Sequence, residues 1–168
     1  TAGIGASNIH DRLPLPENFR YIPFLVNDTA KDEIKCTSCG ICAKVCPPQC
    51  IWIVRGTDPA TGRPRPQPGE FFIDADICMN CGFCAEYCPF DAIKMDHDFE
   101  IASYGRNVFN MEKLLKSSEY YKSIRPVNYA REEAARIAEA EAKKAKEAAR
   151  AAAAQSAKPT GAEAATAT

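Results

Sequence analysis

Two runs of cysteine decide how this chain folds. The first is Cys36-Thr-Ser-Cys39-Gly-Ile-Cys42-Ala-Lys-Val-Cys46-Pro47, and the second is Cys78-Met-Asn-Cys81-Gly-Phe-Cys84-Ala-Glu-Tyr-Cys88-Pro89. Both follow the spacing C-x2-C-x2-C-x3-C-P, and each cysteine of the second run lies 42 positions after its counterpart. The chain of 168 residues therefore contains an internal duplication built around eight of its nine cysteines.

This spacing is typical of chains that hold cubic [4Fe–4S] clusters through cysteine thiolates. In two-cluster proteins of the bacterial ferredoxin type, the fourth cysteine of each run binds the cluster of the other run. We therefore expect two [4Fe–4S] clusters as the cofactors and metal sites of this chain. The expected ligands of cluster 1 are Cys36, Cys39, Cys42 and Cys88, and those of cluster 2 are Cys78, Cys81, Cys84 and Cys46. Because the ligands cross between the halves, we expect cluster binding to be part of folding.

The residues between the cysteines suit a backbone that wraps around a cluster. Gly40 and Gly82 occupy matching places and permit a positive φ angle and a close backbone approach. Neighbouring N–H groups can then point at the cluster sulfurs, which raises the reduction potential. Ile41 and Phe83 follow these glycines as apolar shields against water, and a proline after each fourth cysteine turns the chain away.

Zinc and disulfide bonds are the alternatives for these cysteines. Zinc favours four ligands in two pairs, whereas this chain has two triplets that are each followed by a Cys-Pro pair. Disulfides need an oxidising compartment, but residues 1–20 lack the apolar core of a signal peptide. Nine is also an odd number of cysteines. Both alternatives are therefore disfavoured.

Short strands are expected on both sides of each cluster loop. Their β-branched and aromatic residues lie at 33–35, 51–54, 71–74 and 92–95, and one or two helical turns are expected at 42–46. The order strand, cluster loop, helical turn, strand then occurs twice. This order predicts an α+β fold, the bacterial two-[4Fe–4S] ferredoxin fold, with an extended N-terminal arm and a C-terminal helical tail. The segment 55–69 is rich in proline and glycine, and we expect a long exposed loop at the tip of a hairpin.

The arm at residues 1–30 precedes the ferredoxin domain, which we expect to span 31–98. Prolines at positions 14, 16 and 23 exclude a helix in the arm. Its large apolar side chains must lie on something, and the sequence leaves open whether this is a partner or the core of the domain itself.

Three further segments are expected after the domain. Residues 99–129 should form a docking segment with a short helix near 110–115 and with tyrosines 120, 121 and 129 in an extended stretch. Residues 130–157 should form a helix rich in Ala, Glu and Lys that has almost no apolar face. Residues 158–168 should form a disordered tail.

Three other residues with possible metal or proton chemistry have simpler interpretations. Cys50 falls opposite Ala92 when the halves are aligned, and we expect a small buried residue beside a cluster rather than a ligand. His10 is expected at the surface, and His97 in a solvent-exposed turn.

Composition excludes several classes of function. The formal net charge is -1, and there is no basic patch with interleaved aromatic residues, so we expect no nucleic-acid partner. No stretch approaches the roughly 20 apolar residues that span a bilayer, which favours a reducing location on the cytoplasmic side. The chain has no G-x-G-x-x-G run after a strand and no Ser/His/Asp or paired-carboxylate arrangement. We therefore expect no catalytic residues and no small-molecule substrate, and electron transfer remains as the chemistry of the chain.

The stretch from about Leu13 to Leu115 resembles the two-cluster iron–sulfur subunit I of bacterial NADH:quinone oxidoreductase, respiratory complex I. Besides the cysteines, the resemblance rests on Leu13-Pro-Leu-Pro-Glu-Asn-Phe-Arg20, Cys46-Pro-Pro-Gln-Cys50-Ile51, Gly69-Glu-Phe-Phe-Ile73, Asp98-Phe-Glu100, Tyr104 and Met111-Glu-Lys-Leu-Leu115. The Ala-rich C-terminal extension is not a general feature of this family, and the family's N-terminal amphipathic helix is missing or lies upstream of Thr1.

The resemblance implies that the chain is an enzyme only as a subunit of a complex. Its clusters would relay electrons from the peripheral arm toward the terminal cluster next to the quinone site. Its partners would be other subunits of a membrane-associated redox complex, with indirect membrane contact at the cytoplasmic face of the inner membrane. The alternatives are a related ferredoxin-type subunit of a hydrogenase or another dehydrogenase, and a free two-cluster ferredoxin.

Overall fold

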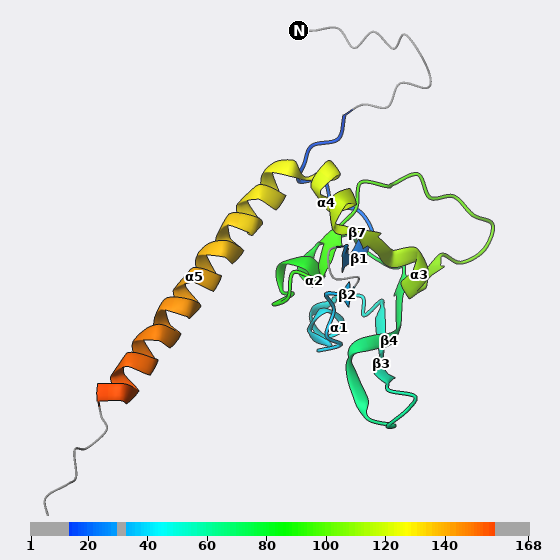
Figure 1. Ribbon diagram of the computed structural model, residues 1–168. Helices are drawn as coiled ribbons and strands as arrows, with labels where there is room; N and C mark the ends of the chain where they lie inside the picture. Colours follow the sequence, from blue (N-terminus) through cyan, green and yellow to red (C-terminus); the bar gives the residue numbers. More distant parts are fainter. Residues whose placement is uncertain (1–13, 30–32, 157–168) are drawn as a thin grey trace, which may run out of the picture. The chain divides into compact units, whose positions relative to one another are not determined.

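A computed structural model describes residues 14–29 and 33–156, with side chains described as far as residue 148 (Figure 1). The chain divides into two units, Thr1–Pro126 and Val127–Thr168. The expectations for His10, for the first part of the arm and for the tail at 158–168 lie outside the described residues.

The first sheet is organised around β1 (Pro23–Asp28). This strand pairs antiparallel with β2 (Glu33–Ile34) and β5 (Ile93–Met95), and parallel with β7 (Leu115–Ser117). Its Phe24, Leu25 and Val26 side chains are each only 1% exposed. A strand buried on both faces needs such a continuous apolar run. The sequence leaves open whether the arm lies on a partner or on the core of the domain itself. Residues 23–28 of the arm lie in the domain's own core.

The second sheet contains the β3 (Ile51–Thr57) and β4 (Pro64–Asp74) hairpin, with β6 (Val108–Phe109) paired to the end of β4. The hairpin strands are longer than expected, because the turn between them occupies only residues 58–63. The prediction of a long loop at 55–69 is therefore wrong. Prolines 64, 66 and 68 alternate along β4, so their missing N–H groups share one side of the strand. Among the described residues, β6 pairs only with Ile73 and Asp74, so β4 is an edge at 64–68, and a strand edge tolerates proline.

Two short helices follow the two cluster loops and complete a mixed α+β architecture. They are α1 (Ile41–Val45) and α2 (Phe83–Glu86), and Gly40 and Gly82 are their N-caps. The expected helical turn near 42–46 is thus present. Six of the eight cysteines of the two runs, all but Cys39 and Cys81, contribute to one hydrophobic core together with strand residues such as Phe71 and Ile73, which are fully buried.

The segment after β6 is more helical than expected. The expected short helix is α3 (Met111–Leu114), which Asn110 caps by accepting the Lys113 N–H at 3.1 Å. The extended stretch expected at tyrosines 120, 121 and 129 is wrong, because α4 (Ser118–Ile124) covers the first two and Tyr129 lies in the helix that begins at Pro126. The Ser117 hydroxyl accepts the Tyr120 N–H at 3.1 Å and starts this helix.

The described part of the second unit is α5 (Pro126–Ser156). The helix begins four residues before position 130 because proline suits the first turn of a helix. Its side chains are almost all exposed as far as residue 148, and Glu139 pairs with Lys143 at 2.7 Å one turn away. Ile137, the one large apolar residue of the expected 130–157 helix, is 52% exposed. None of the described helices combines the length and apolar composition of a membrane span.

Candidate iron–sulfur centres

Two small cavities gather the cysteines of both runs. Cavity A is lined by Cys36, Cys39, Cys42 and Cys88. Cavity B is lined by Cys78, Cys81, Cys84 and Cys46. Each cavity therefore receives three cysteines from one run and the fourth from the other, and these are the two crossed sets that the spacing predicts. Strands β1 and β5 each contribute lining residues to both cavities.

The cluster loops share an uncommon backbone at matched positions. The φ angle is positive at three pairs of residues that lie 42 positions apart, namely Ser38 and Asn80, Gly40 and Gly82, and Gln49 and Asp91. Glycine adopts this conformation at low cost, whereas most other residues pay for a close contact between Cβ and the carbonyl oxygen. The same local folding in both halves places their cysteines in equivalent arrangements.

Backbone N–H groups point at several of the cysteine sulfurs, as expected. Ser38 and Asn80 donate their N–H groups to Cys36 and Cys78, respectively. The Ala92 N–H donates to the Cys88 sulfur at 3.4 Å. Such bonds stabilise negative charge on sulfur, and they are a main lever by which a protein sets the potential of a cluster.

The cavities are poor places for bare thiolates. Burial, together with the charge of neighbouring cysteines, raises the pKa of Cys42 and of Cys84 to about 12. Burial also raises the pKa of Cys36 and of Cys78 above the ordinary value, against the lowering effect of the N–H bonds. Thiolates there require a nearby positive charge, which bound iron would provide.

The residues present fit two [4Fe–4S] clusters. Each cavity offers four thiols from the two runs, the soft donor set that such clusters use, and cavity B also holds Cys50; the rest of both linings is mostly apolar. None of the nine cysteines is in a disulfide. Among the described residues, no group of three or more His, Cys, Asp or Glu side chains is placed to hold a single metal ion.

Cys50 also lies in cavity B. Its side chain is 1% exposed, and its Sγ atom is 3.5 Å from the Cys46 Sγ. The structure thus places it where the alignment of the two halves predicts a small buried neighbour.

Arg20 contacts the second cluster loop, which the sequence did not predict. Its guanidinium donates a hydrogen bond to the Cys81 carbonyl oxygen and pairs with Glu86 Oε1 at 2.5 Å. Arg20 is 61 residues from Cys81 along the chain, so no local pattern could have indicated this contact. The nearest signal was the presence of Arg20 within a stretch that resembles the family.

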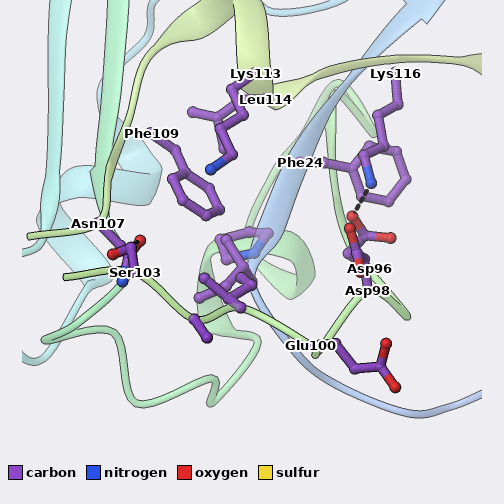
Figure 2. Close-up of a pocket in the computed structure, with 14 residues that line it drawn as sticks. Phe24, Asp96, Asp98, Glu100, Ser103, Asn107, Phe109, Lys113, Leu114 and Lys116 are labelled. Carbon is purple, nitrogen blue, oxygen red and sulfur yellow. Dashed lines mark hydrogen bonds and ion pairs between the residues drawn. The ribbon is translucent and has the colours of Figure 1, made fainter. Parts of the chain in front are cut away.

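A third hollow of about 290 Å³ lies beside β1 and the segment 98–107 (Figure 2). Two of its charged groups are engaged with each other, since Lys116 forms an ion pair with Asp96. The Tyr120 hydroxyl donates to the same carboxylate at 2.5 Å. Burial, with help from Asp96, raises the pKa of Tyr120, so this hydroxyl keeps its proton. Lys113 lies 3.7 Å from the centre of the Phe109 ring.

His97 differs from the expectation of a solvent-exposed turn. The residue is half-buried, and its Nε2 atom lies 3.3 Å from the Glu17 carbonyl oxygen. Its ring meets Phe19 edge-on at 5.9 Å. The expectation failed because the flanking aspartates suggested solvent, whereas residues of the arm cover the ring.

Residues 35–92 match the family described as the 4Fe-4S dicluster domain. Together with the two cysteine-lined cavities, this match defines the class of the protein as a dicluster iron–sulfur protein.

Three relatives of known name show which family of dicluster proteins the chain belongs to. The chain is 42% identical over 109 residues to NADH-quinone oxidoreductase subunit I 1 of Geobacter sulfurreducens, which covers 63% of this chain and 79% of that protein. It is 38% identical, with the same coverage, to subunit I 2 of Geobacter metallireducens. It is 40% identical over 115 residues to subunit I 2 of Symbiobacterium thermophilum, covering 67% of this chain but only 47% of that relative, about half its length. The chain belongs to the family of NADH-quinone oxidoreductase subunit I.

Proposed function

We propose that this chain is an electron-transfer subunit of NADH-quinone oxidoreductase, respiratory complex I, and that it carries two [4Fe–4S] clusters. The observation that carries the proposal is the gathering of four cysteines in each of two cavities, in a chain whose relatives bear the name of that subunit. The enzyme activity belongs to the complex, and the part played by this chain is to pass electrons.

The two crossed sets of cysteines are the proposed ligands. Cluster 1 lies in cavity A and cluster 2 in cavity B. When bound, each cluster supplies one-electron transfer. The chain holds the sulfurs, directs N–H groups from Ser38, Asn80 and Ala92 at them, and excludes water with apolar lining such as Phe71. The matched backbone angles support a duplicated ferredoxin fold in which each half completes the cluster site of the other.

The position of the chain in the complex follows from the family resemblance. The two clusters would stand between the peripheral arm and the cluster next to the quinone site. The partners would be the neighbouring subunits, and contact with the cytoplasmic face of the membrane would be indirect. The outer segments, 1–22 and 99–129, are proposed to include the docking surfaces for these neighbours.

Analysis of iron and sulfide in the anaerobically purified chain tests the cofactor. We expect about eight of each per chain, as two [4Fe–4S] cubes require, and two reducible signals in electron paramagnetic resonance (EPR). A colourless, iron-free chain would contradict the proposal. Identification of the proteins that copurify with the tagged chain tests the complex, because a hydrogenase subunit or a free ferredoxin would bring other neighbours or none.

A further inference from the structure

The two halves differ at one buried position next to the clusters. Cys50 lies four residues after Cys46, and Ala92 lies four residues after Cys88. Their exposed fractions are 1% and 2%. Cys50 lines cavity B and Ala92 lines cavity A, so they occupy equivalent places beside the two proposed clusters.

Only one of these residues has a side chain that can donate a proton to sulfur. The Cys50 Sγ lies 3.5 Å from the Cys46 Sγ, within the range of a sulfur hydrogen bond, and it also hydrogen-bonds the Cys78 thiol. Both neighbours are proposed ligands of cluster 2. At cavity A, Ala92 offers its backbone N–H to Cys88 but has no donor on its side chain.

Ligation decides which thiol is the donor. A cysteine that binds iron does so as a thiolate and has no proton to give. If Cys46 and Cys78 hold cluster 2, the shared proton must therefore belong to Cys50. Because Cys50 is buried, water does not compete for this bond.

We propose that Cys50 is a positioning residue whose S–H donates to the Cys46 sulfur and raises the reduction potential of the cluster in cavity B. Hydrogen bonds to ligand sulfurs stabilise the added negative charge of the reduced cluster, so a donor favours reduction. The matched position in cavity A, Ala92, has no side-chain donor. The two halves thus repeat the ligands but not the hydrogen bonding around them. This inference rests on the proposed function, since it assumes that both clusters are present.

The test is an EPR-monitored redox titration of the full chain with both clusters bound, comparing Cys50→Ala, Cys50→Ser and Ala92→Cys. Cys50→Ala should lower the midpoint potential of one cluster and leave the other unchanged. Cys50→Ser retains a donor and should stay closer to the unchanged chain than Cys50→Ala does. Ala92→Cys adds a donor at the matched place and should raise the potential of the other cluster. Pulsed electron–nuclear double resonance should show an exchangeable proton coupled to one cluster that disappears in Cys50→Ala.

Several results would overturn the inference. One is a set of midpoint potentials that does not move in Cys50→Ala while about eight irons remain bound. Another is the loss of a whole cluster in Cys50→Ala together with no shift in Ala92→Cys, which would make Cys50 a ligand or a packing residue. An iron-free unchanged chain would instead overturn the proposed function, so the two failures are distinguishable.

Discussion

The two cluster loops have the same backbone but different neighbours. A Cβ atom added at Gly40 would meet none of the described residues within 4 Å. The same atom at the matched Gly82 would lie 2.8 Å from the guanidinium nitrogen of Arg20. The second loop is therefore covered by a side chain from the N-terminal arm, while the corresponding glycine of the first loop is open.

The two halves therefore share the proposed cysteine ligands but differ in the residues that surround them. Glu86 on α2, which pairs with Arg20, corresponds to the exposed Lys44 on α1. Cys50 in the same way corresponds to Ala92. Iron ligation demands the same geometry in both halves, whereas potential and stability can be adjusted separately by the residues around the ligands.

Replacing either of the two cysteines that cross between the halves should have the largest effect. Cys46→Ser should abolish or strongly perturb the cluster of Cys78, Cys81 and Cys84, and Cys88→Ser should do the same to the cluster of the first run. The reason is that each cavity takes its fourth cysteine from the other half. Iron analysis and EPR of the two variants measure the outcome. Each variant is the control for the other, and loss of the cluster nearest in sequence would refute the crossed assignment.

Replacing each of the two matched glycines should lower the free energy of unfolding by different amounts in the two loops. Both Gly40→Ala and Gly82→Ala force alanine into a positive φ angle, at about 1–2 kcal/mol. Gly82→Ala should cost up to about 1 kcal/mol more, because the new methyl group must displace Arg20 from its partners. Anaerobic urea unfolding of the cluster-loaded chain gives both free energies of unfolding. Equal losses would show that Arg20 contributes nothing to the second loop.

Removing Arg20 itself should have a smaller effect. Arg20 and Glu86 have side chains that are 47% and 50% exposed, so solvent screens their attraction. Arg20→Ala should therefore lower the free energy of unfolding by only about 0.2–1 kcal/mol, and high salt should shrink the difference. Lys44→Ala on α1 is the matched control on the other loop. The contact would have no energetic role if the two variants lost the same amount at every salt concentration.

A substitution in the turn at residues 58–63, which joins the two halves, should have the smallest effect. The Thr61 hydroxyl, with the Ala60 N–H, holds the pKa of Asp58 below its ordinary value. This bond therefore contributes stability at pH values above the unfolded pKa of Asp58, and the contribution is lost as the pH falls through the folded pKa. Thr61→Val should raise the pKa of Asp58 toward its ordinary value, as carbon-detected nuclear magnetic resonance would record.

Thr57→Val, on the neighbouring strand of the hairpin, is the control for this change and should leave the pKa of Asp58 unaltered. Both variants should also leave the two cluster potentials unchanged, because residues 57–61 line neither cavity. A shifted potential would mean that the connection couples the two halves.

Much of the fold was predictable because its signals are local. Ligand spacing, matched glycines and short β-branched stretches predicted the α+β class, the strands around each loop and the two groups of four cysteines. The errors came where contacts override local composition. The prolines of 64–68 suggested a loop, yet they suit an edge of β4. Tyr121 suggested a surface contact, yet it is 3% exposed in the helix α4.

By itself, the sequence predicted that eight cysteines divide into two sets of four, because the spacing within each run limits how a short backbone can wrap around a cluster. Only the tertiary structure decided what surrounds these sets. Three features depend on contacts between segments that are far apart in the sequence. They are the position of β1 at the centre of a sheet, the packing of Arg20 over Gly82, and the hydrogen bond of the Cys50 thiol to Cys78. Such contacts leave no periodic or local pattern, since their energy comes from packing rather than from spacing.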